Sequence, residues 1–372
     1  MGLRYQPLAA CMNVSRASTK LIRSENGLLA TRAIDEPGYD HDGLGRRLGL
    51  LIEGAATNLL RYSCGFDNAL WEKGSGVMVA ASTIAAPDGT MTALQLDLPG
   101  TAGGADGLYQ NVGGLVASET YSFAIWMRAV SGMADITLGG IDGSSAHAIS
   151  LDETWQRVWI SEPASGTSSS PKISTVITAL PASVLIWNAQ LEAGPMPTSD
   201  IISNGIPAAR ACDHVTLDPG DWFAQGRGTM VFDLHTAPDW QGIWRIVQLY
   251  SSSLNDDHLD LGYDSDADQL RISLRAGGVP VVTQSLFGQL AKDSRHRIAL
   301  AWDDDVVSVG LDGVVLSSPD GFAMPRKLTN IVLGSFDGVD KAMNGHLRNL
   351  AYWPEKLSDA RLSELSTVHS YQ

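Results

Sequence analysis

Tryptophan and arginine alternate with core-type residues in one segment, so that they share a single face of a predicted strand. In TYSFAIWMRA, residues 120–129, period-two alternation places four apolar side chains on one face and leaves Trp126 and Arg128 on the other. An aromatic ring can stack on the apolar side of a pyranose while neighbouring polar groups bond its hydroxyls. The chemistry that this face suggests is carbohydrate binding.

Two further segments add residues of the same kind. In WQRVWIS, residues 155–161, Val158 and Ile160 form the apolar face, and IWNAQLE, residues 186–192, places its amides opposite Trp187, Ala189 and Leu191. If the three strands share an outer face, a sugar groove would be lined by Trp126, Arg128, Arg157, Trp159, Asn188 and Gln190. The alternative is that an N-terminal arm or a partner chain covers Trp126 and Trp159 while the arginines pair with carboxylates. General experience favours this alternative, because large aromatic residues pack more often than they bind.

Metal chemistry has less support. Asp264, Asp266 and Asp268 suggest a calcium loop, but an EF-hand would need glycine at position 269 and glutamate at position 275, where the chain has Gln269 and Arg275. A solvated hairpin turn is predicted there and again at residues 303–305, with structural calcium as the alternative. The eight histidines form no HExxH, HxH or Cys/His spacing, so we predict no metal site and no cofactor.

Catalysis also lacks a signature. A glycosidase needs two facing carboxylates roughly 5–10 Å apart. The chain contains neither an ExDxxE strand, which would place three carboxylates in one groove, nor the GxSxG turn of an esterase. We therefore predict no catalytic residues, and a glycan depolymerase built from noncontiguous residues stays an alternative.

Composition and charge restrict the partners. The chain has 372 residues, of which 44% are hydrophobic, enough for two cores. Its formal net charge of −15 opposes docking on nucleic acid or anionic lipid. Three widely spaced cysteines argue against a disulfide framework and for folding in a reducing cytosol. Neither an export signal nor a run of ~20 apolar residues is present, so we expect no membrane insertion.

Short strands separated by Gly, Pro, Asp and Ser predict an all-β chain with two sandwiches. We expect an irregular N-terminal arm over residues 1–48, a jelly roll over 49–200 and a second sandwich over 201–372, with the proline-rich segment 193–210 as the connection. The chain ends on PEKLSDARLSEL, which predicts a short helix capped by Ser358 with Leu362 and Leu365 on one face.

Several strings resemble a known family in register. GLLIEGAATNLL at 49–60, YSCGFDNALWEK at 62–73 and AAPDGTMTALQL at 85–96 resemble the opening of bacteriophage and prophage tail-fibre or head-spike proteins. In that family this opening leads into a carbohydrate-binding-module-like jelly roll. The three strand segments quoted above and AARACDHVTL at 208–217 also resemble family segments, and the end of the chain is similar to the close of a concanavalin-like, laminin-G-type lectin domain.

The resemblance covers nearly the whole chain and implies particular roles. Residues 49–60 would pass along the first sandwich, Asn58 would satisfy backbone groups there, and Trp71 would plug the core. The protein would be a non-enzymatic spike or fibre on a virion surface, assembled in the bacterial cytoplasm, that binds host cell-surface polysaccharide for adhesion.

The resemblance also implies partners. The basic arm would attach to other virion proteins through Arg4, Arg16, Lys20 and Arg23. Fibres of this kind are often trimers, so a homo-oligomer is expected by analogy. The alternatives are a capsule depolymerase and a purely structural decoration or adaptor protein of the virion.

Overall fold

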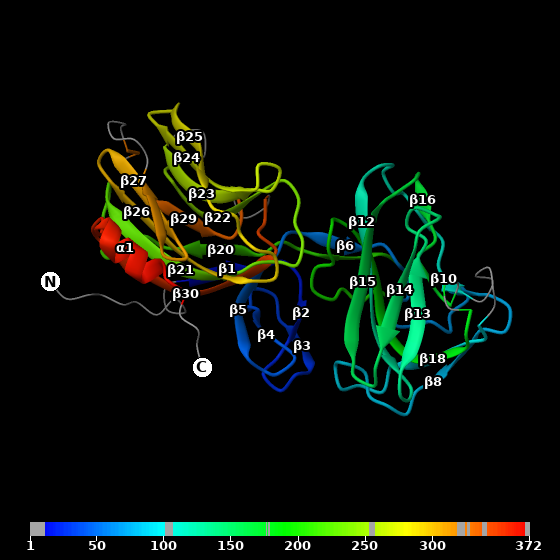
Figure 1. Cartoon of the computed structure of the whole chain (residues 1–372). Coiled ribbons are helices and arrows are strands. Elements are labelled where there is room, and N and C mark those ends of the chain that lie inside the picture. Colours follow the sequence, from blue (N-terminus) through cyan, green and yellow to red (C-terminus); the bar gives the residue numbers. More distant parts are fainter. Residues whose placement is uncertain are drawn as a thin grey trace. The chain divides into compact units, whose positions relative to one another are not determined.

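The computed structural model describes residues 12–100, 107–175, 177, 179–252, 257–317, 324–325, 328–336 and 341–368. The chain divides into two compact units. Unit 1 contains residues up to Thr19, Arg32–Ala55 and Ala211 onward, and unit 2 contains Lys20–Thr31 and Ala56–Arg210. All secondary structure except one short helix in the described ranges is strand, which confirms the predicted all-β class with two sandwiches (Figure 1).

Unit 1 is a sandwich of two antiparallel seven-stranded sheets. In order, the first sheet consists of β1 (Met12–Ser15), β20 (His214–Leu217), β29 (Asn330–Leu333), β22 (Ile243–Tyr250), β23 (His258–Asp264), β24 (Gln269–Ala276) and β25 (Val279–Phe287). In order, the second consists of β28 (Val314–Ser317), β27 (Val306–Leu311), β26 (Arg295–Asp303), β21 (Gly228–His235), β30 (Gly345–Trp353), β5 (Arg47–Ile52) and β4 (Tyr39–His41).

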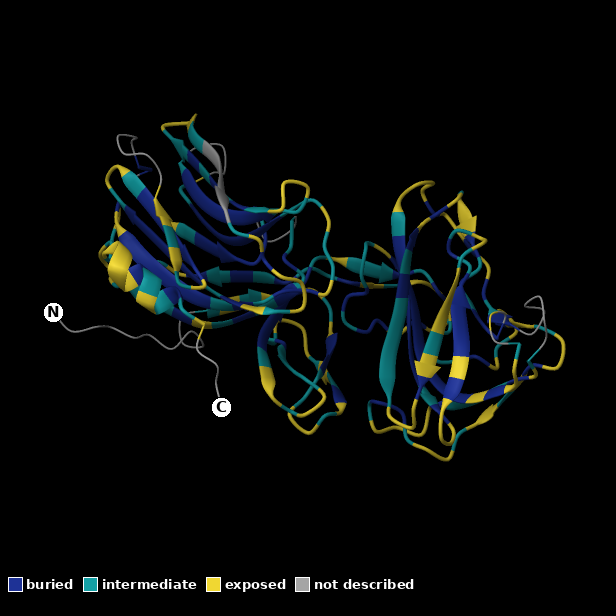
Figure 2. Ribbon diagram, viewed as in Figure 1, coloured by how far each residue is buried: buried dark blue, intermediate teal, exposed yellow. Residues whose placement is uncertain are grey.

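The core of unit 1 lies between these sheets. Phe232 and Leu300 from one sheet and Leu249, Leu261 and Ile272 from the other are at most 1% exposed within one hydrophobic cluster. Along β24 the inward and outward residues alternate, as the pleat of a sheet requires, whereas a bulge in β22 places both Ile246 and Val247 in the core. Figure 2 colours most central strands as buried and many of the turns as exposed.

A short helix, α1 (Asp359–Ser366), packs on the outer face of the second sheet of unit 1, beside β26 and β27 (Figure 1). The Ser358 side chain accepts a hydrogen bond from the Arg361 backbone N–H and caps the helix. Leu362 is fully buried against Val231 and Ala299, and Leu365 packs at the edge of this cluster. The predicted helix, its cap and its apolar face are confirmed.

Unit 2 is a smaller sandwich of two five-stranded antiparallel sheets. In order, the first consists of β15 (Gln156–Pro163), β12 (Thr120–Ala129), β18 (Ala182–Ala193), β9 (Leu94–Leu98) and β8 (Met78–Ala81). In order, the second consists of β14 (Ala146–Leu151), β13 (Ala134–Gly139), β17 (Lys172–Ser174), β10 (Leu108–Tyr109) and β7 (Glu72–Lys73). The remaining strands form three two-stranded pairs: β2 (Lys20–Arg23) with β3 (Leu29–Arg32), β6 (Ala56–Asn58) with β19 (Ala208–Arg210), and β11 (Val112–Gly113) with β16 (Ser168–Ser169).

Asn58 and Trp71 take the places that the sequence predicts for them in unit 2. The fully buried Asn58 side chain donates to the Ala189 and Ile201 carbonyls at 2.9 and 2.8 Å and accepts from two backbone N–H groups. Trp71 is 1% exposed, its indole N–H donates to the Tyr62 carbonyl, and its ring lies 4.9 Å from that of Phe66. Asn58 therefore ties its own strand to β18 and to the segment around Ile201.

The N-terminal segment is not a separate arm, which corrects the predicted boundary at residue 48. Residues 12–19 and 32–55 belong to unit 1 and residues 20–31 to unit 2. Leu50 and Ile52 are buried in the core of unit 1, so the opening of the 49–60 segment does not lie along the first predicted sandwich. Gly49, with φ +143°, allows close approach to β30, because a Cβ there would lie 2.7 Å from the Leu347 carbonyl oxygen.

Two of the predicted attachment residues are interior. Arg16 is 2% exposed and pairs with the buried Asp213 at 3.0 Å, while its guanidinium also donates to the Ser18 and Ala33 carbonyls. Lys20 is 1% exposed in unit 2. Neither side chain is available to a partner protein, and Arg4 lies outside the described residues.

Candidate functional site

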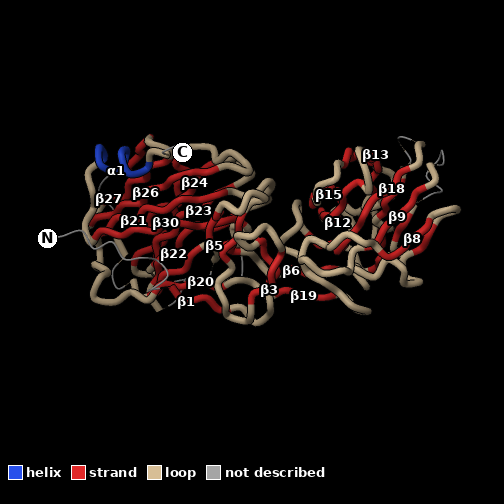
Figure 3. The backbone as a smooth tube through the Cα atoms, turned by 90° about the horizontal axis from the view of Figure 1, so that it is seen from below, coloured by secondary structure: helices blue, strands red, loops and turns tan. Residues whose placement is uncertain are grey.

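The predicted strand faces are correct on the core side of the first sheet of unit 2. Phe123, Ile125 and Met127 of β12 lie in the core, as do Ala189 and Leu191 of β18. Figure 3 shows β12, β15 and β18 next to one another, so their outer faces form one surface.

The predicted face of Trp187 is wrong. The pairing of β12 with β18 shifts register between Ala124 and Trp126, and Asn188 has a φ of +43°. This β-bulge breaks the two-residue alternation, so Trp187 clusters with Trp126 instead of lying in the core with Ala189.

Three of the predicted groove residues come together, but around a carboxylate of the same unit. The buried Asp200 accepts hydrogen bonds from the Trp126 indole N–H at 3.0 Å and from the Asn188 amide at 2.8 Å. Arg157 approaches it at 3.4 Å and donates to the Thr198 carbonyl at 2.7 Å. The arginine therefore pairs with a carboxylate, as the alternative to the groove expects.

Gln190 completes this buried network. Its amide donates to Glu192 at 2.7 Å and its carbonyl oxygen accepts from the Ile201 N–H at 2.7 Å. Burial raises the pKa of Glu192, whose carboxylate also binds the Thr198 backbone N–H and hydroxyl. Asn188 and Gln190 are 0% exposed, so the chain segment at 198–201 occupies the place that was predicted for a sugar.

A hairpin from the N-terminal segment covers the Trp126 side of the sheet. β2 and β3 contribute Leu21 and Leu29 to a buried cluster with Trp126 and Trp187. The Leu29 N–H donates to the Pro87 carbonyl at 3.0 Å, which ties the hairpin to a turn of unit 2. Trp126 is consequently 4% exposed, in agreement with the alternative that the arm covers it, whereas Trp159 is half-buried.

A pocket of about 260 Å³ remains where this hairpin meets the sheet. Arg23, Trp126, Arg128 and Trp155 line it together with apolar groups of Leu28 and of the turn at 84–87. We call this hollow the Trp126 pocket. Its two arginines are half-buried, and among its described lining residues there is no carboxylate.

Hydrogen bonds to the backbone fix the walls of the Trp126 pocket. The Trp155 indole N–H donates to the Ala85 carbonyl at 3.0 Å, and the Arg23 guanidinium donates to the Gly27 carbonyl at 2.9 Å. Arg23 also lies 5.1 Å from the centre of the Trp126 ring, within cation–π range. Arg128 donates through Nε to the Ala129 carbonyl at 3.2 Å. The site therefore has a preformed aromatic wall and two oriented guanidinium groups.

The pocket differs from the predicted groove in its membership. Trp126 and Arg128 line it, whereas Arg157, Asn188 and Gln190 belong to the buried network beneath. Sequence reasoning missed Trp155 as a wall and assigned Arg23 to virion attachment. The strand pattern places Trp155 on the outer face, but nothing local in the sequence brings residue 23 to it.

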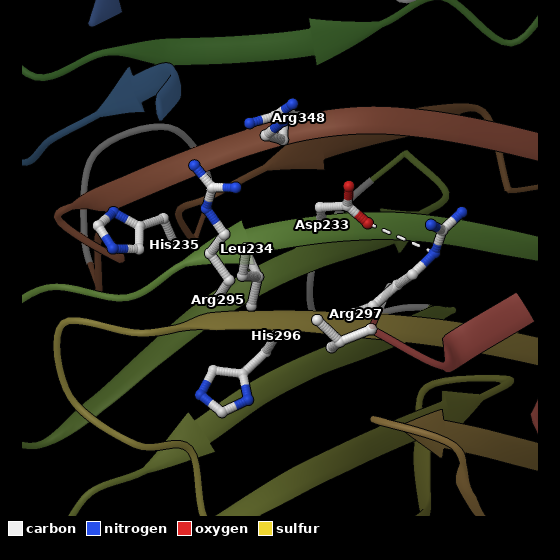
Figure 4. Close-up of a pocket in the computed structure, with 8 residues that line it drawn as sticks. Asp233, Leu234, His235, Arg295, His296, Arg297 and Arg348 are labelled. Carbon is white, nitrogen blue, oxygen red and sulfur yellow. Dashed lines mark ion pairs between the residues drawn. The ribbon is translucent and has the colours of Figure 1, made fainter. Parts of the chain in front are cut away.

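A second pocket lies on the outer face of unit 1, near the ends of β21, β26 and β30 (Figure 4). Arg295, Arg348 and His235 project from these strands, and Asp233 lies 3.4 Å from Arg297. Burial lowers the pKa of His235, with a further contribution from His346. The cavity volume is about 30 Å³, which is enough for a water molecule but not for a sugar ring.

The acidic turns form no metal centre in the part of the chain that the structure describes. No group of three or more His, Cys, Asp or Glu side chains there is arranged to hold an ion. Asp264 instead accepts the Asp266 and Ala267 N–H groups at 3.1 and 3.2 Å, in a turn between β23 and β24. The predicted hairpin is confirmed. Among described residues no helix is long and apolar enough to cross a bilayer.

Comparisons with known proteins give distant matches. No protein-family model matches the chain, and no curated protein matches it. A sialidase carbohydrate-binding module, CBM40, of Ruminococcus gnavus bound to α2,3-sialyllactose is 17% identical with a TM-score of 0.34, over 39% of this chain and 84% of its own.

Two other solved structures show the same level of similarity. A pentraxin of Limulus polyphemus is 17% identical with a TM-score of 0.32, over 41% of this chain and 72% of its own. Domains LG4–5 of the mouse laminin α1 chain are 11% identical with a TM-score of 0.28, over 82% of this chain and 94% of their own. Matches this distant do not support a function. The functional proposal depends on the pocket itself.

Proposed function

We propose that the chain is a non-enzymatic glycan-binding protein and that the Trp126 pocket binds an acidic saccharide. The observation that carries this proposal is the pairing of Arg23 and Arg128 with Trp126 and Trp155 in one pocket, without a carboxylate among its described lining residues. The chain as a whole has a net charge of −15, whereas the charged side chains among the described lining residues of this pocket are both arginines.

The chemistry of the walls matches an acidic sugar. Guanidinium groups bind carboxylates through paired, charge-assisted hydrogen bonds, and these are stronger than neutral ones. The half-buried Trp155 offers an apolar face for a pyranose, while Trp126 serves as a fixed wall. A volume of 260 Å³ lies just below the ~300 Å³ at which pockets for drug-sized ligands begin. We therefore expect the pocket to take a single sugar residue of a longer chain.

The biological role that we propose is adhesion of a phage or phage-derived particle to host cell-surface polysaccharide. This part is supported by the sequence resemblance to tail-fibre and head-spike proteins. A site that holds one sugar residue would bind weakly. Many copies on a particle would raise the overall affinity through avidity. A virion-surface location and a trimeric state belong to the same proposal, but attachment through Arg16 or Lys20 does not, because both are buried.

The experiment is binding of matched acidic and neutral probes by isothermal titration calorimetry. Sialyllactose is compared with lactose, which lacks the acidic residue, and tri-galacturonate serves as a second acidic probe. Arg128→Ala should weaken binding of the acidic probe about tenfold, since a hydrogen bond to a charged group contributes roughly 1.5–3 kcal/mol. Trp155→Ala removes the apolar face for the sugar ring and should also weaken binding. Arg61→Ala is the matched control, because Arg61 is exposed in the same unit outside the pocket.

The outcomes separate the alternatives. Binding of both acidic probes that survives Arg128→Ala and Trp155→Ala would remove the pocket from the proposal. Release of new reducing ends from an acidic polysaccharide would establish a depolymerase instead. If a multivalent form of the protein binds none of the acidic probes, the chain is better described as a structural decoration protein.

A further inference from the structure

Unit 1 contains a larger hollow at one end of its sandwich, with a volume of about 790 Å³. Three connections form it: Trp240 and Gln241 between β21 and β22, Ser265–Asp268 between β23 and β24, and Gln289–Lys292 between β25 and β26. We call it the rim hollow. It lies wholly within unit 1 and shares no lining residue with the Trp126 pocket.

Trp240 gives the rim hollow an aromatic wall. Its ring centre lies 5.8 Å from that of Trp244 and 5.7 Å from that of Tyr263, both of which are buried in the core. Core packing therefore fixes the orientation of the indole, while Trp240 itself is only half-buried. A ring held in this way loses little entropy when a ligand stacks on it.

Hydrogen bonds from the strands hold the surrounding loops. The Tyr263 hydroxyl donates to Asp268 in one loop and accepts from the Leu290 N–H of another at 3.3 Å. The Thr236 hydroxyl donates to the Ala291 carbonyl at 2.7 Å, and a ring nitrogen of the buried His296 lies 3.2 Å from the same oxygen. Two of the three connections are thus fixed to buried residues, so the hollow is preformed.

The polar groups of the rim hollow are those that recognise hydroxyls. Asp266 and Gln289 are exposed, and Ser265 lies beside Asp266 on the wall. Carboxylate and amide oxygens accept hydrogen bonds from sugar hydroxyls, and amide N–H groups donate to them.

The charge of the rim hollow disfavours an anion. Its cation, Lys292, pairs with Asp239 and lies 5.5 Å from the centre of the Trp240 ring, while the lining carboxylates are those of Asp266 and Asp268. An acidic sugar would therefore be repelled.

We propose that the rim hollow is a second saccharide-binding site, which takes an uncharged, hydroxyl-rich sugar stacked on Trp240. It acts independently of the Trp126 pocket and does not require the proposed function of unit 2. A chain with both sites would bind polysaccharides that contain acidic and neutral residues through two different units.

The test is saturation-transfer NMR and tryptophan fluorescence on the full chain with neutral oligosaccharides at millimolar concentration. The probes are lactose, cellotriose and N-acetylchitotriose, with tri-galacturonate as the acidic comparison. We expect at least one neutral probe to bind, and Trp240→Ala to weaken that binding about tenfold. Asp266→Asn and Gln289→Ala change exposed groups that the core does not need, so they test the site even if Trp240→Ala unfolds.

Trp222→Ala is the matched control in unit 1. Trp222 is half-buried and packs against Phe223 and Tyr352, but it does not line the rim hollow. Neutral binding that is lost in the Trp240, Asp266 and Gln289 variants and kept in the Trp222 variant supports the site. Absence of binding by every neutral probe, or binding unchanged in all three variants, overturns it. Loss of tri-galacturonate binding through Arg128→Ala reports on the Trp126 pocket alone.

Discussion

The Trp126 pocket and the rim hollow both contain tryptophan held by core packing, but they differ in charge and in construction. Arginines line the first, whereas carboxylates and amides dominate the second. The first is made by a hairpin of residues 20–31 lying on a sheet, and the second by loops between strands that follow one another in the chain, two of which cross from one sheet to the other. The aromatic wall therefore favours a sugar ring in both sites. The charged residues of the hairpin and of the loops determine whether that sugar is acidic or neutral.

The largest effect that we predict concerns the floor of the Trp126 pocket. Asp200→Ala should lower the free energy of unfolding by about 3–5 kcal/mol, because it leaves the Arg157 charge buried without its carboxylate. It also removes the acceptor of the Trp126 indole N–H. Urea denaturation measures the change, with exposed Asp67→Ala as the control. A loss no larger than that of the control would show that the network does not hold the pocket.

The difference in charge between the two hollows is tested by reversing it. Arg128→Glu should weaken binding of acidic probes about a hundredfold, because it removes a bond of roughly 1.5–3 kcal/mol and adds repulsion. Neutral sugars at the rim hollow should bind as before. The calorimetric titrations used for the Trp126 pocket measure both, with Arg61→Glu as the control. Equal losses for acidic and neutral probes would mean that the two hollows do not discriminate by charge.

A smaller effect is expected from loosening the loops of the rim hollow. Tyr263→Phe removes the hydroxyl that joins Asp268 to the Leu290 N–H. The binding free energy of a neutral sugar should become weaker by about 1 kcal/mol, which is a several-fold loss of affinity. Acidic probes at the Trp126 pocket should be unaffected. The fluorescence titration measures the change. If Tyr263→Phe binds neutral sugars as tightly as the unmodified chain, the hydroxyl does not position the loops.

Local sequence patterns were sufficient for features that depend on a few neighbouring residues. Alternation along residues 120–129 correctly places Phe123, Ile125 and Met127 in the core of unit 2. The cap and apolar face of the C-terminal helix follow equally from short-range rules, and both are observed at Ser358 and Leu362. The strand that carries the aromatic and basic face could be identified in the same way.

The features of the site that the sequence did not predict depend on contacts between residues that are far apart in the chain. The bulge at Asn188 interrupts the alternation and moves Trp187 to the outer face, although only the tolerance of asparagine for positive φ hints at it. The approach of Arg23 to Trp126 joins residues more than a hundred positions apart, and no period in either segment encodes that contact. The strand pattern thus identified the face but not the segments that cover it.

The smallest effect that we predict distinguishes the two units by their response to acid. Burial lowers the pKa of His235 in unit 1 below its ordinary value of 6.5, and His346 and Arg295 act in the same direction, while Asp293 opposes them. Between the lowered pKa and 6.5, the unfolded chain binds more protons at this position than the folded chain does. The free energy of unfolding should therefore fall as the pH drops from about 6.5 toward the pKa of the folded state.

Scanning calorimetry between about pH 5 and 8 measures this dependence as a change in Tm. His235→Asn removes the titrating group and should flatten the profile over that range. His147→Asn is the control in unit 2, where the ring is 47% exposed and pairs with Glu162. A profile with the same slope in the His235 variant would mean that other groups carry the acid response. The His235 and His346 rings, whose centres lie 5.7 Å apart, would then be a packing feature of the outer face and would not make unit 1 sensitive to acid.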